Sequence, residues 1–289
     1  MNITSLKSAL VLLQCMCFAL VLSAQNKKEN TDYPSLTIKK NIRYAEIPEL
    51  IKEGTASDRL LDIYFPKEKQ KEKLPVLVYI HGGGFVDGSK DQRTDFCSRL
   101  ASGGIAVIAI NYRLYLKQHK ISGASCGANM SKGLPKSGEF HEGLQLAIKT
   151  AGEDVSLALV WVKKNAKKYN LDINNVALSG GSAGAITALY TGLCTKTPIK
   201  VKHIVNMWGG VENNKQIISP NIPVLTFHGD KDALISVEYA YSLHNFLEEK
   251  GNTSSKLIIL KGIGHGGPAQ KEVFNTYIDE FLDFIKGNK

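Results

Sequence analysis

The chain has 289 residues, of which 43% are hydrophobic and 22% are charged. This length allows one large hydrophobic core, and α/β domains of this size commonly stay single. The formal net charge is +9, but the basic residues are scattered along the chain. The densest basic run, residues 67–73, alternates with acids, which indicates a solvated loop rather than a nucleic-acid-binding arm. A positive balance still favours acidic surroundings, such as anionic polysaccharide or lipid head groups.

Residues 1–24 are predicted to be a signal peptide, and residues 25–289 a single domain. Lys7 is the only charge in the first segment, an apolar stretch covers residues 9–22, and two small residues precede Gln25. The apolar stretch is short for a membrane span and matches an export signal that is removed. We therefore expect an exported chain, periplasmic or secreted, with no stable membrane insertion after cleavage. An uncleaved anchor is the alternative.

Short apolar runs alternate with longer amphipathic segments along the rest of the chain. The runs are rich in Val and Ile and bounded by turn residues, as strands buried on both faces are; they lie at residues 74–80, 105–110, 176–178, 204–207, 224–227 and 257–260. Helical patterns lie at about residues 91–102, 154–169, 183–195, 237–250 and 269–286. This alternation predicts a mostly parallel sheet of about eight strands with helices on both faces. Its antiparallel edge is expected at residues 36–45 and 60–65.

The segment at residues 116–152 interrupts this alternation. It is polar and rich in glycine, and it contains His119, Cys126 and His141. A connection of this length inside a compact domain is usually functional or mobile. We interpret it as a cap-like insert beside the site, with a plain surface excursion as the alternative.

Three cysteines, Cys97, Cys126 and Cys194, follow the predicted signal peptide. An odd number in an oxidising compartment allows at most one disulfide within a monomer. Three isolated buried thiols are the alternative. No Cys-x-x-Cys or histidine-rich spacing indicates a metal site.

The strongest local motif is Gly180-Gly181-Ser182-Ala183-Gly184, between a predicted strand and a predicted helix. A nucleophile needs exposure at the carboxyl end of a strand, and a sharp turn with small neighbours provides it. The N-terminus of the next helix also offers free N–H groups to a developing oxyanion. The bare GxSxG pattern is loose, but the strand–turn–helix context favours Ser182 as a nucleophile over a chance match.

A second motif, His81-Gly82-Gly83-Gly84, follows a predicted buried strand about 100 residues before the serine. Consecutive glycines let backbone amides face a ligand that a side chain would obstruct. We expect the amides of Gly83, Gly84 and Ala183 to form an oxyanion hole; a flexible turn is the alternative. His81 is expected to hold this loop rather than to act as a base.

Candidates for the base and the acid follow the last two predicted strands. Of the seven histidines, only His265 lies in a glycine-flanked loop after the last strand. An imidazole beside the serine accepts its proton, and a carboxylate on the other ring nitrogen fixes the tautomer. Asp230 and Asp232 both follow the preceding strand and could supply that carboxylate. Asp230, directly after Gly229, is better suited to shaping its own turn.

These motifs resemble those of α/β-hydrolase carboxylesterases related to hormone-sensitive lipase, which carry HGGG and GxSAG motifs. Further similar stretches lie at residues 61–66, 111–114 and 154–162, and the resemblance extends over about residues 36–286. It implies the α/β-hydrolase fold and the triad Ser182, Asp232 and His265, with the oxyanion donors already named. The chain also resembles secreted esterases that remove acetyl or feruloyl groups from plant polysaccharides. No family pattern is recognised in residues 116–152, so the resemblance does not predict the shape of the pocket or the substrate.

The predicted function is hydrolysis of carboxylic esters through an acyl-enzyme on Ser182, without cofactor or metal. The expected substrate is a small-molecule or carbohydrate-linked ester with a short acyl group, because no long apolar lid helix is visible. Nucleic acid is not expected as a partner. Two alternatives are a serine peptidase of the prolyl-oligopeptidase kind, which usually adds a large second domain and lacks the HGGG run, and a catalytically inactive binding protein. The sequence leaves the acyl group, the alcohol and the oligomeric state open.

Overall fold

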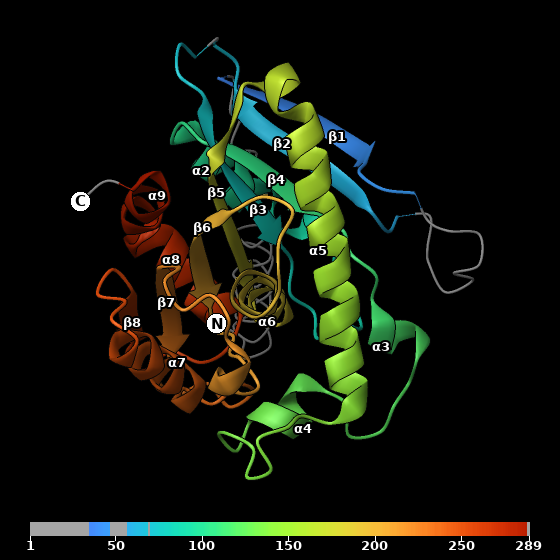
Figure 1. Cartoon of the computed structure of the whole chain (residues 1–289), viewed down its shortest axis with the longest axis vertical. Coiled ribbons are helices and arrows are strands. Elements are labelled where there is room, and N and C mark those ends of the chain that lie inside the picture. Colours follow the sequence, from blue (N-terminus) through green and yellow to red (C-terminus); the bar gives the residue numbers. More distant parts are fainter. Residues whose placement is uncertain (1–34, 47–56, 69, 288–289) are drawn as a thin grey trace, which may run out of the picture. The chain divides into compact units, whose positions relative to one another are not determined.

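A computed structural model describes residues 35–46, 57–68 and 70–287 of the chain. The predicted signal peptide, residues 1–24, lies outside the described residues. The described part contains one eight-stranded sheet in the order β1-β2-β4-β3-β5-β6-β7-β8 (Figure 1). This arrangement confirms the predicted mostly parallel sheet with helices on both faces.

The strands match the apolar runs of the sequence closely. The antiparallel edge consists of β1 (Leu36–Arg43) and β2 (Leu60–Pro66), and β2 also pairs antiparallel with β4 (Ala106–Ile110). The other pairs are parallel and involve β3 (Leu74–Ile80), β5 (Leu171–Gly181), β6 (Val201–Met207), β7 (Val224–Gly229) and β8 (Lys256–Leu260). The strands β3 and β4 are apolar throughout because both faces of the sheet are covered.

Helices cover the sheet in two layers, which are visible in Figure 1. One layer contains α5 (Glu142–Tyr169), α6 (Ala183–Leu189) and α7 (Glu238–Glu249); the other contains α2 (Thr94–Ser102), α8 (Gly267–Thr276) and α9 (Ile278–Lys286). Strand side chains alternate between the layers. In β3, Val76 and Val78 pack in the cluster of α5, whereas Leu77 and Tyr79 pack in the cluster of α2.

The long helix α5 begins at Glu142, twelve residues before the helical pattern predicted from the sequence. The side chain of His141 caps its first turn by accepting a hydrogen bond from the Gly143 amide at 3.0 Å. Leu144 and Ile148 are buried at helical spacing and anchor this extension on the core. Residues 142–152, which were expected to belong to the irregular insert, are therefore helical.

The rest of the insert contains two short helices, α3 (Tyr115–Gln118) and α4 (Cys126–Met130). Met130 and Phe140 are buried in the cluster of α5, so this segment packs on the core. The Met130 carbonyl also accepts a hydrogen bond from the Ser236 amide at 3.0 Å. The insert thus lies against the connection between β7 and α7.

A buried ion cluster explains the similar stretches at residues 111–114 and 154–162. Asp154, fully buried on α5, accepts hydrogen bonds from Arg59 Nε at 3.0 Å and from the Arg113 backbone amide at 2.8 Å. The Arg113 guanidinium also contacts the Asp154 carboxylate at 3.0 Å. The cluster joins the antiparallel edge, the end of β4 and α5, because each charge needs its partners once it is out of water.

The three cysteines are free thiols in the structure. Cys97 lies on α2 and Cys126 on the opposite face of the sheet, and both are buried, whereas Cys194 is half-buried. The thiols are therefore isolated, as in the second alternative, but only two of the three are buried. Within the described residues, no helix is long and apolar enough to cross a membrane. The same residues contain no group of three or more His, Cys, Asp or Glu side chains that could hold a metal ion.

Candidate active site

Ser182 lies on a strained turn between β5 and α6. Its φ of 55° is in the left-handed region, which a residue with a side chain adopts only when its surroundings enforce it. The flanking glycines allow this turn to press against the end of β3. A Cβ on Gly180 or Gly184 would lie 2.4 or 2.1 Å from the Ile80 carbonyl oxygen. Side chains at these positions would push the serine away from the sheet.

Loops at the carboxyl ends of β5, β7 and β8 bring Ser182, Asp232 and His265 together. Ser182 Oγ lies 2.9 Å from His265 Nε2, and His265 Nδ1 lies 2.6 Å from Asp232 Oδ2. Because the carboxylate can only accept, Nδ1 carries the ring proton and Nε2 is free to accept from the serine hydroxyl. The three side chains form the hydrogen-bonded line that general-base activation of a serine requires.

The environment of Asp232 keeps it ionised. Burial by itself would raise the pKa of this carboxyl, but hydrogen bonds from His228 and His265 and from the backbone outweigh it and hold the pKa well below its usual range. The backbone donors are the Leu234 and Ile235 amides, both 2.9 Å from Oδ1. A carboxylate held in this way stabilises an imidazolium on its other side.

The second acid, Asp230, has a different role. Its Oδ1 accepts a hydrogen bond from the Gly262 amide at 2.7 Å, across the gap to the loop after β8. The sequence suggested that it shapes its own turn, whereas the structure uses it to tie together the two loops that carry Asp232 and His265. Of the two alternatives left open by the residues, Asp232 is the one beside the imidazole.

The glycine loop after β3 lies directly against the serine. A Cβ on Gly82 would be 3.5 Å from Ser182 Cβ. Gly83 has a φ of 110°, and its carbonyl accepts hydrogen bonds from the Val86 and Asp87 amides at 3.1 and 3.0 Å. This tight turn leaves no room for a side chain, because a Cβ on Gly83 would lie 1.9 Å from the Asp87 oxygen.

The other two oxyanion candidates adjoin this turn and the serine. Gly84 continues the loop with a φ of 62°. Ala183, buried, is the first residue of α6 and directly follows Ser182. All three predicted donors therefore belong to the two turns that meet at the nucleophile.

His81 supports this loop, as the sequence suggested. Its ring stacks on Tyr112 with the centroids 4.4 Å apart, and the Tyr112 hydroxyl donates to the His81 carbonyl at 2.9 Å. Burial lowers the pKa of His81 to about 4, although a hydrogen bond to the backbone partly opposes this shift. The ring is therefore neutral near pH 7, and Nδ1 lies 2.7 Å from the Gly82 carbonyl, to which it donates.

Two residues beside the site were not predicted. His228, fully buried at the end of β7, places Nε2 2.9 Å from the Ile235 carbonyl and 3.4 Å from Asp232 Oδ2. Both partners only accept, so Nε2 carries a proton that it shares between them. Trp208, after β6, lies with its ring 6.5 Å from that of His265 in an edge-to-face arrangement. The sequence signal that could have identified them is their position, since a histidine and a tryptophan lie at the ends of two buried strands that lead into the site.

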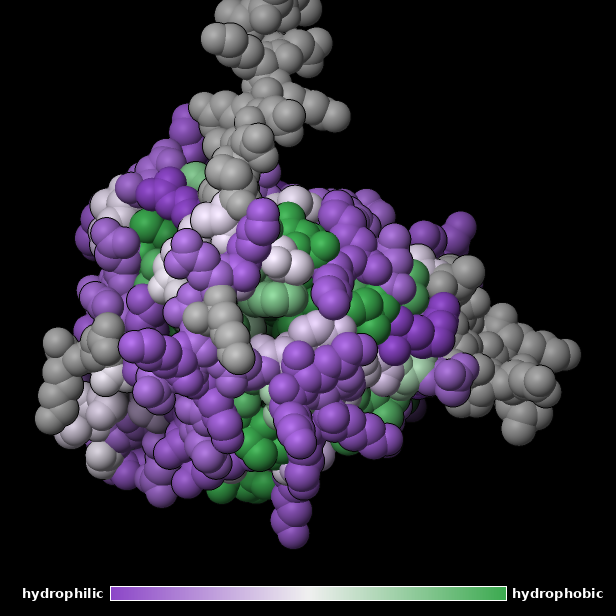
Figure 2. Space-filling model, turned by 90° about the horizontal axis from the view of Figure 1, so that it is seen from above, coloured by the Kyte–Doolittle hydropathy of each residue, from purple (hydrophilic) through white to green (hydrophobic). Residues whose placement is uncertain are grey.

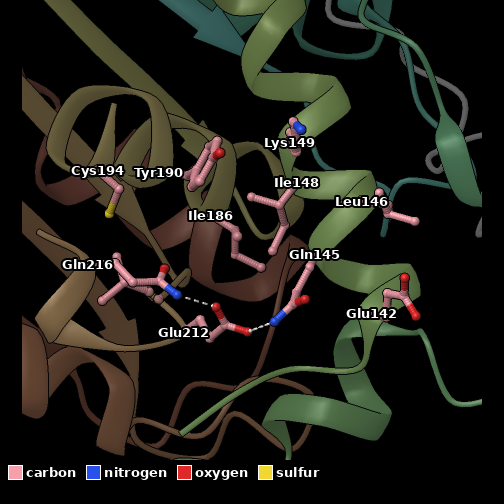
Figure 3. A pocket seen from close by; sticks show the side chains of 12 residues that line it. Glu142, Gln145, Leu146, Ile148, Lys149, Ile186, Tyr190, Cys194, Glu212 and Gln216 are labelled. Carbon is pink, nitrogen blue, oxygen red and sulfur yellow. Dashed lines mark hydrogen bonds between the residues drawn. The ribbon is translucent and has the colours of Figure 1, made fainter. Parts of the chain in front are cut away.

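A cavity of about 510 Å³ lies between α5, α6, the π-helical turn η2 (Tyr190–Cys194) and the loop after β6 (Figure 3). Ile186, one turn along α6 from the serine, contributes to its apolar side. Glu212 provides a fixed carboxylate, which accepts hydrogen bonds from Gln145 Nε2 at 2.7 Å and Gln216 Nε2 at 2.6 Å. The cavity therefore combines an apolar wall with an oriented polar group beside the nucleophile helix.

Comparisons with known proteins agree with this geometry. The family model described as BD-FAE matches residues 61–130 and 145–217. A fumonisin B1 esterase from Sphingopyxis macrogoltabida is 35% identical over 147 residues, which cover 50% of this chain and 24% of that protein. The chain has the α/β-hydrolase fold and is similar to esterases related to hormone-sensitive lipase. The match spans well under two thirds of that relative's length.

Solved structures share the fold of this chain over nearly its whole described length. A truncated carbohydrate esterase from gut microbiota aligns with a TM-score of 0.61 at 19% identity, covering 87% of this chain and 96% of that one. Esterase 2 of Thermogutta terrifontis, phosphorylated by paraoxon, aligns with a TM-score of 0.62 at 19% identity, covering 88% and 95%. At this level of identity the likeness establishes the fold.

Proposed function

We propose that this α/β hydrolase is a serine carboxylic ester hydrolase, and that Ser182, His265 and Asp232 carry its chemistry. The observation that carries the proposal is the hydrogen-bonded line from Ser182 Oγ through His265 to Asp232 on a strained strand-to-helix turn. The esterase relatives support the same reaction class. An inactive binding protein would not need a serine held in this strained conformation beside a base.

The reaction proceeds in two halves. Ser182 Oγ attacks the ester carbonyl carbon while His265 Nε2 accepts the hydroxyl proton, and the carbonyl oxygen becomes an oxyanion. The amides of Gly83, Gly84 and Ala183 are proposed to hold that oxyanion. When the tetrahedral intermediate collapses, His265 returns the proton to the leaving alcohol. Water then attacks the acyl-enzyme by the same route and releases the carboxylic acid and free serine.

For the substrate, we propose a short acyl group on a polar alcohol, such as a sugar. The cavity beside α6 supports a polar alcohol, because Glu212, Gln145, Gln216 and Lys149 offer acceptors and donors for hydroxyl groups. The fold is shared with a carbohydrate esterase from gut microbiota. We also propose export to the periplasm or medium, on the pattern of residues 1–24; cell fractionation with and without that segment tests this.

The test of activity combines covalent labelling with a substrate panel. A fluorophosphonate probe should label the wild-type protein at Ser182 and leave Ser182→Ala unlabelled, with the melting temperature nearly unchanged. Loss of a triad nucleophile lowers kcat by roughly 10⁶. Aryl acetates should be cleaved faster than aryl octanoates, and aminoacyl-proline amides should be resistant. Labelling that persists in Ser182→Ala would place the nucleophile elsewhere, and amide cleavage would favour the peptidase alternative.

A further inference from the structure

A second cavity, of about 510 Å³, lies far from the serine and is lined by lysines. Five lysines and one glutamate surround it, so that the cavity accounts for a net +4 of the chain's +9: Lys39, Lys67, Glu68, Lys71, Lys167 and Lys168. All five lysines are exposed. Among the described residues, no carboxylate forms an ion pair with Lys67, Lys71 or Lys167. Uncompensated charge of one sign in a hollow attracts a ligand of the opposite sign.

The floor of this lysine cavity is apolar. Phe65 and Pro66, at the end of β2, lie beside Leu74 and Tyr169. The Phe65 and Tyr169 rings meet edge-to-face with their centroids 5.8 Å apart. Leu74 and Tyr169 are buried, so a ligand could reach mainly the half-buried Phe65 and Pro66. A ligand that suits this hollow would therefore have an apolar surface toward Phe65 and Pro66 and negative charge toward the rim.

The walls are held in place by hydrogen bonds rather than by chance proximity. Asn170, which ends α5 in the left-handed conformation, donates from Nδ2 to the carbonyls of Gln70 and Glu72 at 3.2 and 2.8 Å. Its own carbonyl accepts from the Leu74 amide at 2.8 Å. These bonds fix the connection between β2 and β3 against the end of α5, so two walls of the cavity are preformed.

The lysine cavity and the serine lie at opposite ends of the sheet. Leu74 begins β3 and Asn170 directly precedes β5, whereas the glycine loop follows the other end of β3 and Ser182 the other end of β5. Seven residues of β3 at about 3.3 Å each separate the two sites by roughly 20 Å. The cavity is thus distinct from the site of ester cleavage.

Figure 2 looks onto the end of the molecule where α5 finishes and β2 connects to β3. Hydrophilic residues cover most of this face, and hydrophobic residues show between them. A bilayer is a flat surface that would touch the lysine tips and leave the hollow empty. A ring-shaped group with an acidic substituent would suit the hollow, with its C–H face toward Phe65 and Pro66 and its charge among the ammonium groups.

We propose that the lysine cavity binds acidic sugar units of an anionic polysaccharide and holds the enzyme on that polymer. The hydrolase would then dock on a charged polymer at one end and cleave esters at the other. The docking role rests on the proposed esterase function, but the binding itself does not. Binding and turnover are therefore measured separately.

The experiment measures binding of the full chain to polygalacturonate at low salt and at about 0.15 M NaCl, where exposed charges are screened beyond about 8 Å. The test variant combines Lys67→Gln, Lys71→Gln and Lys167→Gln. Lys39 and Lys168 are kept because both ammonium groups pack over the Tyr169 ring, at 5.4 and 5.3 Å. We expect the dissociation constant of the test variant to rise about tenfold, as the loss of three exposed ion pairs implies.

A matched variant separates the cavity from general surface charge. Lys132→Gln, Lys136→Gln and Lys271→Gln remove the same charge from exposed lysines that do not line the cavity. This control should bind polygalacturonate within about twofold of wild type, and uncharged dextran should bind to none of the proteins. Equal losses of affinity for polygalacturonate in the two triple variants would overturn the proposal, and so would a wild-type protein that does not bind polygalacturonate.

Two further measurements separate the remaining outcomes. Wild-type binding to phosphatidylglycerol vesicles without binding to polygalacturonate would overturn the proposal in favour of a membrane surface. Hydrolysis of a soluble aryl acetate should be the same in wild type and the variant that lacks Lys67, Lys71 and Lys167, because the cavity is remote from Ser182. Retained polymer binding by Ser182→Ala supports the proposal whether or not the protein proves to be an esterase.

Discussion

Replacing Asp232 by asparagine should abolish most of the activity while the matched change at Asp230 should not. Asp232 accepts His265 Nδ1–H at 2.6 Å. The amide of the introduced asparagine can present an N–H to that ring nitrogen, which then has to accept and moves the ring proton to Nε2. That tautomer cannot accept the proton of Ser182. In a comparable triad this exchange lowers kcat about 10⁴-fold, which corresponds to about 5 kcal/mol of transition-state stabilisation.

Asp230 provides the matched control because it contacts only the loop that carries His265. Its Oδ1 accepts from the Gly262 amide at 2.7 Å, and an asparagine side-chain oxygen can accept the same bond. Asp230→Asn should therefore keep kcat within about tenfold and lower the free energy of unfolding by about 0.5–1.5 kcal/mol. The assay is kcat and KM on an aryl acetate, with thermal unfolding of each variant. An inactive, well-folded Asp230→Asn beside an active Asp232→Asn would refute the assignment.

Four further results are expected. Gly83→Ala should lower kcat at least 10²-fold with little change in KM, because its Cβ would lie 1.9 Å from the Asp87 backbone oxygen. A Cβ on Gly84 would lie no closer than 3.9 Å to any neighbour, so Gly84→Ala should lower kcat less than tenfold. Equal losses of kcat in the two variants would contradict this expectation. His228→Leu should lower kcat about tenfold by removing the N–H that faces Asp232, and His228→Gln should recover part of the lost kcat. Equal kcat values for the two variants would mean that His228 acts through packing alone. Asp154→Ala should lower the free energy of unfolding by about 3–5 kcal/mol, measured by urea denaturation, because two arginines lose their buried counter-charge. Because the pKa of Asp232 is depressed in the folded protein, its contribution to the free energy of unfolding is present at neutral pH and is lost as pH falls below about 4. The free energy of unfolding of Asp232→Asn, measured by urea denaturation, should therefore depend less on pH below about 4.

The sequence predicted most of the fold because burial is encoded locally. The run at Leu74–Ile80 is apolar at every position. This pattern predicts a strand in a sheet that is covered on both faces, even though it does not say which helices cover it. The start of α5 was missed because its first turns carry polar residues and a glycine among the buried ones. Only the surface beneath them, and the cap from His141, shows why Leu144 and Ile148 continue the helix. A helix that depends on tertiary packing has a weak signal of its own.

The nucleophile and the base of the candidate site were readable for the same local reason. The glycines next to Ser182 in the sequence are what allow its strained turn, so the turn can be predicted from adjacent residues. His265 likewise lies in a short loop after the last strand. The choice between Asp230 and Asp232 depended on how two loops meet, because a displacement of two residues decides which carboxylate reaches the imidazole. His228 likewise acquires its role only through contact with Asp232.

By itself, the sequence determined the order of the elements and, from their alternation along the chain, the mostly parallel sheet. It also identified Ser182 and His265 as candidates, because each lies in a motif that spans a single turn or loop. Tertiary structure alone decided which acid faces the base and which lysines share a hollow. Lys39, Lys71 and Lys167 are far apart along the chain and meet only because β1, the β2–β3 connection and the end of α5 come together. Long-range proximity of this kind is set by how the sheet pairs and how its helices cross it, and no local pattern records it.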